Sequence, residues 1–238
     1  MARAAILSRR DAGGGLSLVT LVPEETAAER YVAAGQYLEA QTPPHEHGYF
    51  ALASDVGARP WQLLVRNTGG AADILARSAV GTEVEVVGPL GAGFPVDRTR
   101  GRPLVIAVVA SALGVARALL AQRLADRERA PTEVLVGVRA AVDVPLVDEV
   151  DGWISRGIGV ELCLSRVELD EHRAVLPRAR RAAGWVQSVL AHRVEQGGIP
   201  AGTIVCAAGP PGMLGDLVAL AERQAALGAH LDVLVNTA

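Results

Sequence analysis

Short apolar runs alternate with longer helical patterns throughout residues 100–238, and this alternation limits the possible folds of the chain more than any other feature. The runs that read as strands are residues 104–109, 133–138, 160–164, 203–206 and 231–235. The segments that read as helices are residues 115–126, 146–156, 184–195 and 214–227. Strands separated by helices form a parallel, doubly wound sheet with helices on its faces.

The first hundred residues have a different rhythm, in which short strand patterns are separated by turn residues. The predicted strands are residues 4–8, 16–22, 35–40, 49–54, 61–66 and 83–87, and a helix is predicted at 71–79. The glycine-rich turn at 11–15 favours a hairpin between the first two strands. Several short strands with one helix are typical of a small antiparallel, Greek-key-like β-barrel.

Polar residues cluster near residues 97–102, where one rhythm gives way to the other. We therefore predict a β-barrel domain at residues 1–99, followed by an α/β domain with a doubly wound parallel sheet at residues 100–238. The polar, Arg-rich stretch 167–181 is predicted to be a surface loop or a surface helix.

Composition argues against several classes of function. The net charge of −3 gives no basic surface for nucleic acid. Lysine is absent from the chain, which excludes Schiff-base chemistry and a lysine-containing phosphate loop. Cys163 and Cys206 stand apart in apolar runs, so neither a zinc site nor an iron–sulfur cluster is indicated. His45 and His47 form a His-x-His pair without an evident third metal ligand, and solvated histidines are the better interpretation.

The sequence also contains no pattern that reads as a membrane span. The longest apolar run, residues 104–116, is shorter than the roughly 20 residues that a bilayer-spanning helix needs. No apolar signal-peptide core precedes the polar residues 8–11. We therefore expect a cytoplasmic protein, for which an oligomer is possible.

A turn rich in glycine and proline follows the strand pattern at residues 203–206. It reads Gly209-Pro210-Pro211-Gly212-Met213, and a helical pattern continues from residue 214. A strand that ends in such a turn and opens a helix directs backbone N–H groups to the carboxyl edge of a parallel sheet, where nucleotides and other small ligands bind. The turn is therefore predicted to contribute to a ligand site.

This turn closes a series of motifs whose order resembles that of the ferredoxin–NADP reductase superfamily. The earlier motifs are Gly35-Gln36-Tyr37, residues 48–54, residues 69–73, Gly81, residues 88–91, residues 137–139, Asp148-Glu149, Trp153 and residues 184–187. The resemblance extends along nearly the whole chain. It is strongest to a divergent reductase-like branch whose flavin motif reads Phe-Ala-x-Ala-Ser.

The resemblance implies that a flavin, either FAD or FMN, binds to the barrel. The implied binding residues are Tyr49, Phe50, Ala51, Leu52, Ala53, Ser54, Arg66, Gly69, Gly70, Ala71 and Ala72. Tyr49 and Phe50 would form a wall for the flat ring or, alternatively, belong to the barrel core. Ser54 would bond a ribityl hydroxyl or cap a turn. Arg66 would bind a flavin phosphate or be a solvated charge at a strand end.

Three residues depart from the flavin motifs of the superfamily. Gly48 stands where an arginine binds the phosphate, and Ala51 stands where a serine bonds the flavin ring. Asp73 places a carboxylate near the phosphate turn, where it would repel an anion by about 1 kcal/mol. Arg66 and the backbone N–H groups of residues 69–72 are the predicted replacement anchors.

The resemblance also implies that NAD(P)H binds to the α/β domain. The implied residues are Ser111, Ala112, Leu113, Gly114, Ser165, Arg166, Gly209, Pro210, Pro211 and Met213. Ala110 and Ala112 replace two glycines of the superfamily's loop, and each adds a methyl group where the backbone would approach the pyrophosphate. Ser165 and Arg166 resemble a pair that holds the 2′-phosphate of NADP, and the alternative is an ordinary arginine at a strand end.

These implications predict a flavin-dependent oxidoreductase that moves electrons between NAD(P)H and a protein or small-molecule acceptor. The altered motifs support an alternative: a degenerate, non-catalytic reductase-like subunit that binds flavin, nucleotide or a protein partner without hydride transfer. A flavin absorbance that NADPH bleaches would distinguish the enzyme from this subunit.

Overall fold

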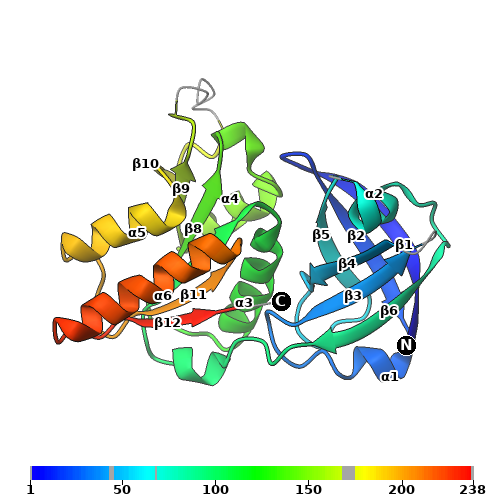
Figure 1. Ribbon diagram of the computed structural model, residues 1–238, viewed down its shortest axis with the longest axis horizontal. Coiled ribbons are helices and arrows are strands. Elements are labelled where there is room, and N and C mark those ends of the chain that lie inside the picture. Colours follow the sequence, from blue (N-terminus) through cyan, green and yellow to red (C-terminus); the bar gives the residue numbers. More distant parts are fainter. Residues whose placement is uncertain (1, 43–45, 68, 168–174, 237–238) are drawn as a thin grey trace. The chain divides into compact units, whose positions relative to one another are not determined.

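The computed structural model describes residues 2–42, 46–67, 69–167 and 175–236 of the chain (Figure 1). These residues form two compact units. The first unit contains the residues up to 96 together with residues 111–127, and the second contains residues 97–110 together with those from 128 onward. Each unit is built around one sheet.

The first unit contains an antiparallel sheet with the strand order β4-β3-β6-β1-β2-β5. Its strands are β1 (Ala2–Gly13), β2 (Leu16–Pro23), β3 (Tyr37–Thr42), β4 (Glu46–Ala51), β5 (Trp61–Arg66) and β6 (Glu83–Leu90). An antiparallel bridge between Leu52 and Leu63 joins the chain just after β4 to β5, the strand at the opposite edge. The sheet therefore closes on itself, and the predicted antiparallel barrel is confirmed.

Alternation along the strands creates the core of the barrel. In β3, Leu38 and Ala40 are fully buried, whereas their neighbours Tyr37 and Glu39 are half-buried, because successive side chains of a strand point to opposite faces. Two short helices, α1 (Glu25–Ala28) and α2 (Gly70–Arg77), cover the barrel. The core joins residues from the strands, the helices and the loops, and its largest members are Trp61, Tyr31, Ile6, Leu21, Leu38, Leu52, Leu63 and Leu75.

The second unit contains a parallel sheet with the strand order β10-β9-β8-β7-β11-β12. Its strands are β7 (Leu104–Val109), β8 (Thr132–Val138), β9 (Gly159–Leu164), β10 (Arg180–Ala183), β11 (Ile204–Ala208) and β12 (Asp232–Val235). Its helices are α4 (Val147–Ser155), α5 (Val186–Glu195) and α6 (Pro211–Ala226). Helices α5 and α6 lie side by side and share one apolar core with the central strands (Figure 1). All of β11 and nearly all of β7 are buried, as expected of a sheet covered on both faces, and the predicted doubly wound fold is confirmed.

The order of the strands reverses at β7. This strand pairs with β8 on one side and with β11 on the other. In open α/β sheets, ligands bind outside the carboxyl ends of the strands at such a point. The chain leaves β7 through a 3₁₀ turn at Ala110–Ala112 and enters helix α3 (Leu113–Ala125), whose contacts place it in the first unit. Two other 3₁₀ turns span Val96–Thr99 and Ala141–Asp143.

The predicted surface loop or helix at residues 167–181 is only partly tested, because residues 168–174 lie outside the described residues. For Arg180 and Arg181 the prediction is wrong, since these residues begin strand β10. Strand β10 pairs in parallel with β9, from Arg180 opposite Glu161 to Ala183 opposite Leu164. Arginine and alanine have little intrinsic preference for strands, so backbone pairing with β9 forms this edge strand.

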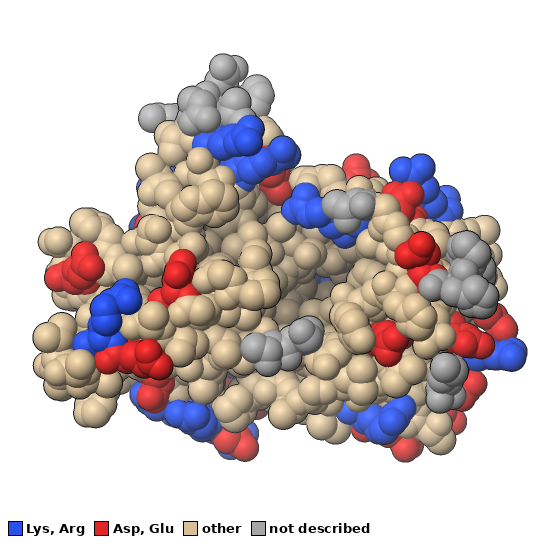
Figure 2. Space-filling model, in the orientation of Figure 1, with Lys and Arg blue, Asp and Glu red and all other residues tan. Residues whose placement is uncertain are grey.

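The surface carries charges of both signs. On the face drawn in Figure 2, acidic and basic side chains of the described residues are interspersed with uncharged ones. Exposed charge pairs of this kind contribute little to stability. Among the helices that the structure describes, none combines the length and the apolar character that crossing a membrane requires.

Candidate functional site

The space beside Gly48 on strand β4 is filled by a neighbouring aromatic ring. A Cβ atom at this position would lie 2.7 Å from the Cε2 and Cζ atoms of Phe50 and 3.1 Å from the Cβ of Ala71. Phe50 is half-buried and packs against the barrel core. The ring and helix α2 therefore occupy the place in which a long side chain at position 48 would begin. This packing gives a physical reason why glycine replaces the arginine of the superfamily.

Tyr49 lies on the other face of β4. Its side chain is 62% exposed, and its ring packs edge-on against Tyr37 with the ring centroids 6.0 Å apart. On the same face, His47 Nδ1 lies 2.8 Å from Glu39 Oε1. Because Tyr49 and Phe50 point to opposite faces, the structure does not bring them together as one wall for a flat ring. His45, the other residue of the His-x-His pair, lies outside the described residues.

The main chain at residues 52–54 is held by hydrogen bonds within the first unit. The Leu52 N–H donates to Gln36 O at 2.9 Å, and the Ala53 N–H donates to Gln62 O at 2.7 Å. Arg117, which lies on α3, donates from Nη1 to Ala53 O and to Gln62 Oε1, both at 2.9 Å. The residues at the end of the flavin-type motif are therefore fixed to β5 and to α3.

Ser54 has a buried hydroxyl oxygen that no described residue satisfies. Its side chain is 5% exposed, and its Oγ atom has no hydrogen-bond partner among the described residues. Its carbonyl oxygen, by contrast, accepts a hydrogen bond from the Tyr31 hydroxyl at 2.8 Å. Burial, followed by the negative charge of Asp55, raises the pKa of Tyr31 although Arg117 opposes the shift, so the Tyr31 hydroxyl stays protonated as a donor. An unsatisfied buried hydroxyl costs about 1–3 kcal/mol and points to a missing hydrogen-bonding group.

A glycine turn opens helix α2, which contacts β4 and β5. Gly69 and Gly70 adopt φ values of 92° and 60°, which only glycine adopts readily. None of the described side chains caps the helix, so its first N–H groups, which include those of Ala71 and Ala72, could bind an anion. Arg66, at the end of β5, is exposed, and its guanidinium has no partner among the described residues.

Two carboxylates lie near this turn. Asp73 is paired with Arg77 on the same helix at 3.1 Å, which offsets the repulsion predicted for it. Glu46 is the less favourable group, because a Cβ atom at Gly70 would lie 3.5 Å from Glu46 Oε2. No local sequence pattern indicates this second contact, because Glu46 stands far from Gly70 along the chain.

At the carboxyl edge of the parallel sheet, the two alanines of the predicted pyrophosphate loop differ in conformation. Ala110 has a φ of 49°, in the left-handed region that its glycine counterpart would adopt without strain. Ala112 has a φ of −65° and a ψ of −8°, which is ordinary for alanine. The loop has therefore kept a glycine-like backbone at position 110 in spite of the added methyl group.

Replacing Ala110 by glycine is expected to raise the free energy of unfolding by about 0.5–1 kcal/mol. The left-handed conformation costs an L-residue about 1–2 kcal/mol, and glycine removes this cost. The greater freedom of glycine in the unfolded chain destabilises the fold and offsets about half of the gain. Ala121→Gly, in the interior of α3, is the matched control and should lower stability by about 1 kcal/mol. Urea unfolding of both variants measures the two changes, and equal losses would show that Ala110 is unstrained in solution.

Close packing surrounds Val109 at the end of β7. A Cβ atom on Gly137 would lie 2.9 Å from Val109 Cγ2 and 2.6 Å from Val186 Cγ2. A Cβ atom on Gly209 would lie 2.8 Å from Met213 Cε. Met213 is buried in the core beneath the turn, whereas Pro210 and Pro211 are exposed at the start of α6. Met213 therefore packs against the turn from the core. The two prolines are exposed and therefore accessible to a ligand.

Ser165 and Arg166 extend the pairing of β9 beyond its regular end. The Ser165 N–H donates to Val138 O at 3.0 Å, and the Arg166 N–H donates to Arg139 O at 2.9 Å. The Arg166 side chain is exposed, and within the described residues it has no partner. Arg139, which directly follows β8, is occupied instead, since it forms a two-bond pair with Asp143 at 2.9 and 3.1 Å.

Trp185 lies beside this pair and was not among the predicted site residues. The Gly184 N–H donates to Leu164 O at 2.8 Å, which brings residue 185 next to the end of β9. The Trp185 side chain is 62% exposed. An exposed aromatic side chain on a residue near the end of β9 suits the flat base of a nucleotide. The signal in the sequence was an aromatic residue directly after a glycine at a helix start.

The two cysteines do not contribute to these sites. Cys163 and Cys206 are both buried, and they do not form a disulfide with each other. Burial, together with the charge of Glu161, raises the pKa of the Cys163 thiol to about 12 although Arg193 opposes the shift. Cys163 therefore stays protonated and unreactive near neutral pH.

Comparisons with known proteins find similarity in structure. No protein-family model matches the chain, and no curated protein sequence matches it. The cytochrome P-450 reductase GcoB of Amycolatopsis is 23% identical, with a TM-score of 0.79 over 100% of this chain and 70% of that one. A ferredoxin–NADP⁺ reductase from Neisseria gonorrhoeae, solved with bound FAD and NADP, is 14% identical, with a TM-score of 0.74 over 99% and 98%.

A third solved structure is the FAD/NAD-binding domain of a nitric oxide dioxygenase from Vibrio cholerae. It is 18% identical, with a TM-score of 0.74 over 98% of both chains. These similarities show that the chain has the two-part fold of the ferredoxin–NADP reductase-like proteins, as its motif order predicts. Fold alone does not fix an activity, so the activity depends on the site residues.

Proposed function

We propose that this chain, which has the reductase fold, is a flavin-dependent oxidoreductase that moves electrons between NAD(P)H and a protein or small-molecule acceptor. The observation that carries the proposal is the start of α2, which has no side-chain cap among the described residues and which follows the exposed Arg66 by a few residues, so that both could bind an anion. The solved neighbours support it, since GcoB is a cytochrome P-450 reductase and the Neisseria reductase contains FAD and NADP.

The residues present fit a flavin. Arg66 and the N–H groups of residues 70–72 would hold its phosphate, and the unsatisfied Ser54 hydroxyl would bond a ribityl hydroxyl. Phe50 or Tyr49 would supply an aromatic face. A flavin bound here would supply the redox chemistry by accepting a hydride and passing electrons on. Residues 1–99 would form the flavin domain, and residues 100–238 the nucleotide domain.

The second unit would hold the nicotinamide nucleotide at the carboxyl edge of its sheet. Ser165 and Arg166 would bind a 2′-phosphate, and Trp185 would stack on the adenine ring. The turn at Gly209–Pro211 would face the ligand. The acceptor is a redox partner, by analogy with the reductases whose names refer to a cytochrome or a dioxygenase.

The non-catalytic subunit stays the second candidate because of one observation. Glu46 places a carboxylate beside the start of α2, where it would repel a flavin phosphate. An absorption spectrum of the purified protein from about 300 to 550 nm, with identification of any released chromophore by mass, separates the two proposals. A stoichiometric flavin that NADPH bleaches without oxygen supports the enzyme, and a protein that takes up neither FAD nor FMN supports the subunit.

Replacing Arg66 by alanine is expected to weaken flavin binding by roughly 10-fold or more. A charge-assisted hydrogen bond contributes about 1.5–3 kcal/mol, and the substitution removes the guanidinium that shortly precedes the turn in the chain. Arg59→Ala is the matched control, since Arg59 is also exposed but precedes β5, whereas Arg66 ends it. Titration of the flavin-free proteins measures both affinities. An Arg66→Ala affinity equal to that of the wild type and of Arg59→Ala would remove Arg66 from the site.

A further inference from the structure

Two acidic side chains of the second unit, Glu133 on β8 and Glu161 on β9, form a carboxylate pair that binds arginines from two other elements. Arg193 on α5 donates from Nη2 to Glu133 at 2.7 Å and from Nη1 to Glu161 at 3.1 Å. The Nη2 atom of Arg180, at the start of β10, lies 3.2 Å from Glu133 and 3.7 Å from Glu161. The carboxylate pair therefore holds both β10 and α5.

The register of the sheet brings the two carboxylates together. Glu161 stands opposite Arg180 in the pairing of β9 with β10, and opposite Leu135 in the pairing of β9 with β8. Glu133 comes two residues before Leu135, so both carboxylates lie on one face of the sheet, because residues two apart in a strand share a face. Gly159 stands opposite Glu133, and a Cβ atom there would lie 3.1 Å from Glu133 Cγ. The glycine therefore leaves room for the Glu133 side chain.

Trp185 lies at the turn between the two elements that the carboxylate pair holds. Strand β10 ends at Ala183, and α5 begins at Val186 (Figure 1). From Arg180 to the turn the chain covers about five residues, or roughly 17 Å as a strand, and from the turn to Arg193 it covers about eight residues, or roughly 12 Å as a helix. Because both arginines reach the carboxylate pair, the strand and the helix form a unit that is closed at Trp185 and tied together at its other end.

The Trp185 side chain depends on its main chain for its position. The side chain is 62% exposed, so neighbouring groups cover little of it. The Gly184 N–H donates to Leu164 O at 2.8 Å, and Trp185 O accepts the Val189 N–H at 2.9 Å, which joins the turn to β9 and to α5. Strand β10 is the edge strand of the described sheet, and its arginines and alanines have little preference for a strand. The pairing of Arg180 with the carboxylates therefore helps to fix the strand that leads to Trp185.

The two arginines differ in burial, which separates their roles. The Arg193 side chain is largely buried together with the carboxylates, whereas the Arg180 side chain is 52% exposed. Two carboxylates that bind one guanidinium would repel each other in its absence, and the repulsion is stronger where water is excluded. Replacement of Arg180 leaves Arg193 between the carboxylates. An Arg180 variant should therefore keep the fold and lose the tie between the carboxylate pair and β10.

We propose that four side chains are positioning residues that hold Trp185 where a nucleotide base stacks, an inference that rests on the proposed function: Glu133, Glu161, Arg180 and Arg193. Arg180 begins its strand and Glu133 is the second residue of its own, so the cluster lies toward the amino end of the sheet, whereas Trp185 follows the carboxyl end of β10. The cluster acts through the strand and the helix. An aromatic ring that is held in place before binding loses less freedom when the base stacks on it, which strengthens binding.

Arg180→Ala is expected to weaken the binding of adenosine 2′-phosphate about 3- to 10-fold. Trp185→Ala should weaken it roughly 10-fold or more, because the base loses its stacking partner. The double variant should bind no more weakly than Trp185→Ala alone, since removal of the ring also removes what Arg180 positions. Calorimetry on the full chain measures the three affinities. Losses that multiply in the double variant would overturn the inference.

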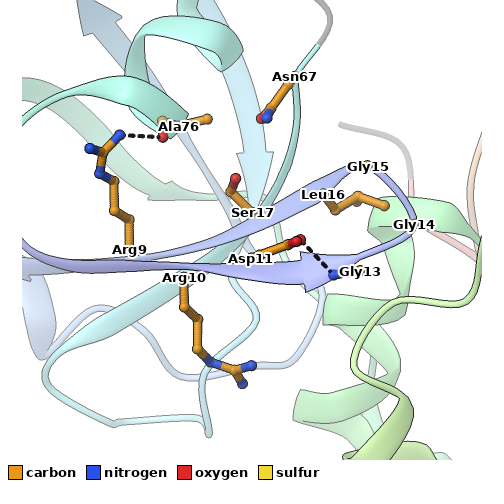
Figure 3. A pocket seen from close by; sticks show the side chains of 10 residues that line it. All are labelled: Arg9, Arg10, Asp11, Gly13, Gly14, Gly15, Leu16, Ser17, Asn67 and Ala76. Carbon is orange, nitrogen blue, oxygen red and sulfur yellow. Dashed lines mark hydrogen bonds between the residues drawn. The ribbon is translucent and has the colours of Figure 1, made fainter.

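Arg178→Ala is the matched control, because Arg178 is 50% exposed, stands two residues before Arg180 and pairs with Asp151 at 2.7 Å. Arg9→Ala is a control in the first unit, where Arg9 lines a pocket of about 480 Å³ beside the hairpin of β1 and β2 and donates to Ala76 O at 3.0 Å (Figure 3). Both variants should bind adenosine 2′-phosphate within about twofold of the wild type. A loss in Arg178→Ala equal to that in Arg180→Ala would overturn the inference, because any loosening of this edge would then weaken binding.

Tryptophan fluorescence gives a readout that needs no nucleotide. The other two tryptophans, Trp61 and Trp153, are 0% and 6% exposed, so the emission that iodide quenches comes mainly from Trp185. The anisotropy of this emission should decay faster in Arg180→Ala, and Arg180→Lys should recover part of the wild-type decay because lysine retains the charge. An unchanged decay in Arg180→Ala would overturn the inference while the proposed function stands. Failure of the wild type to bind either adenosine 2′-phosphate or NADPH would overturn the proposed nucleotide site and the inference with it.

Discussion

Replacement of Arg193 by methionine is expected to lower the free energy of unfolding by about 2–3 kcal/mol at pH 7. Arg193, on α5, donates to Glu133 Oε2 at 2.7 Å and to Glu161 Oε2 at 3.1 Å. These side chains are 18%, 26% and 12% exposed, so methionine would leave two largely buried carboxylates. Their remaining partner, Arg180, is half-exposed and lies 3.2 and 3.7 Å away.

This loss should depend on pH. Burial would raise the pKa of Glu133, but the hydrogen bond and charge of Arg193, together with Arg180, outweigh burial and lower the pKa. A carboxylate whose pKa is lowered by folding stabilises the fold above its unfolded pKa of about 4.3, and the contribution disappears as the pH falls through the folded value. Without Arg193, only Arg180 opposes burial, so the lowering of the Glu133 pKa is reduced or lost. The difference between wild type and variant should therefore be largest at pH 7 and should shrink below about pH 4.

Urea unfolding of the wild type and the variant at pH 7 and below about pH 4 measures this difference in the free energy of unfolding. Arg3→Met removes an exposed pair with Glu83, whose side chains are 67% and 63% exposed, and should cost at most about 1 kcal/mol. Adding Glu133→Gln and Glu161→Gln to Arg193→Met should recover most of the loss, since no buried charge then lacks a partner. A loss that is the same at both pH values would mean that the Arg193 stem acts through packing alone.

Replacement of Arg166 by alanine should weaken NADPH binding by roughly 10- to 100-fold and leave NADH binding nearly unchanged. The Arg166 guanidinium is exposed at the end of β9, next to Ser165, and no described residue occupies it. A phosphate dianion would gain about 1.5–3 kcal/mol from one charge-assisted pair, and only NADPH carries the 2′-phosphate.

Binding of the two nucleotides by calorimetry measures this preference without turnover. Arg166→Lys should keep part of it, because lysine retains the charge but not the planar fork of arginine. Titration with adenosine 2′-phosphate gives a second measurement that does not depend on a bound flavin. Equal losses of affinity for NADPH and NADH would mean that Arg166 stabilises this edge of the sheet and does not bind the 2′-phosphate.

Local sequence signals predicted most of the secondary structure. The predicted strands 61–66 and 104–109 match β5 and β7 residue for residue, because each is an apolar run bounded on one side by a proline that ends pairing. Strand β10 could not be predicted in this way, since its arginines and alanines form a strand only by pairing with β9. The spacing of apolar residues alone predicted both sheets. Strands of the parallel sheet are buried on both faces and read as continuous apolar runs, whereas strands of the barrel are buried on one face and alternate.

The candidate site was less accessible to sequence reasoning. The glycines at 69 and 70 indicated the turn that opens α2, because a turn with positive φ values depends on local residues. The Phe50 ring beside Gly48 and the carboxylate of Glu46 beside Gly70 depend on how distant segments pack, and no local pattern encodes such contacts. Ala110 is an intermediate case: its replacement of glycine was visible, whereas its retained left-handed backbone was not.

Helix α3 has a consequence for attempts to divide this protein. The helix follows β7 in the sequence, yet Arg117 holds Ala53 O and Gln62, and a Cβ atom at Gly114 would lie 2.7 Å from Ala53 Cβ. The chain thus passes from one unit to the other near residues 96, 110 and 127. A fragment that ends at residue 99 would lack this helix and would expose the surface of β5 that packs against it. A single cut between two separately expressed halves would therefore not give two complete units that reassemble. The barrel fragment would have to carry α3, for example through circular permutation of the chain.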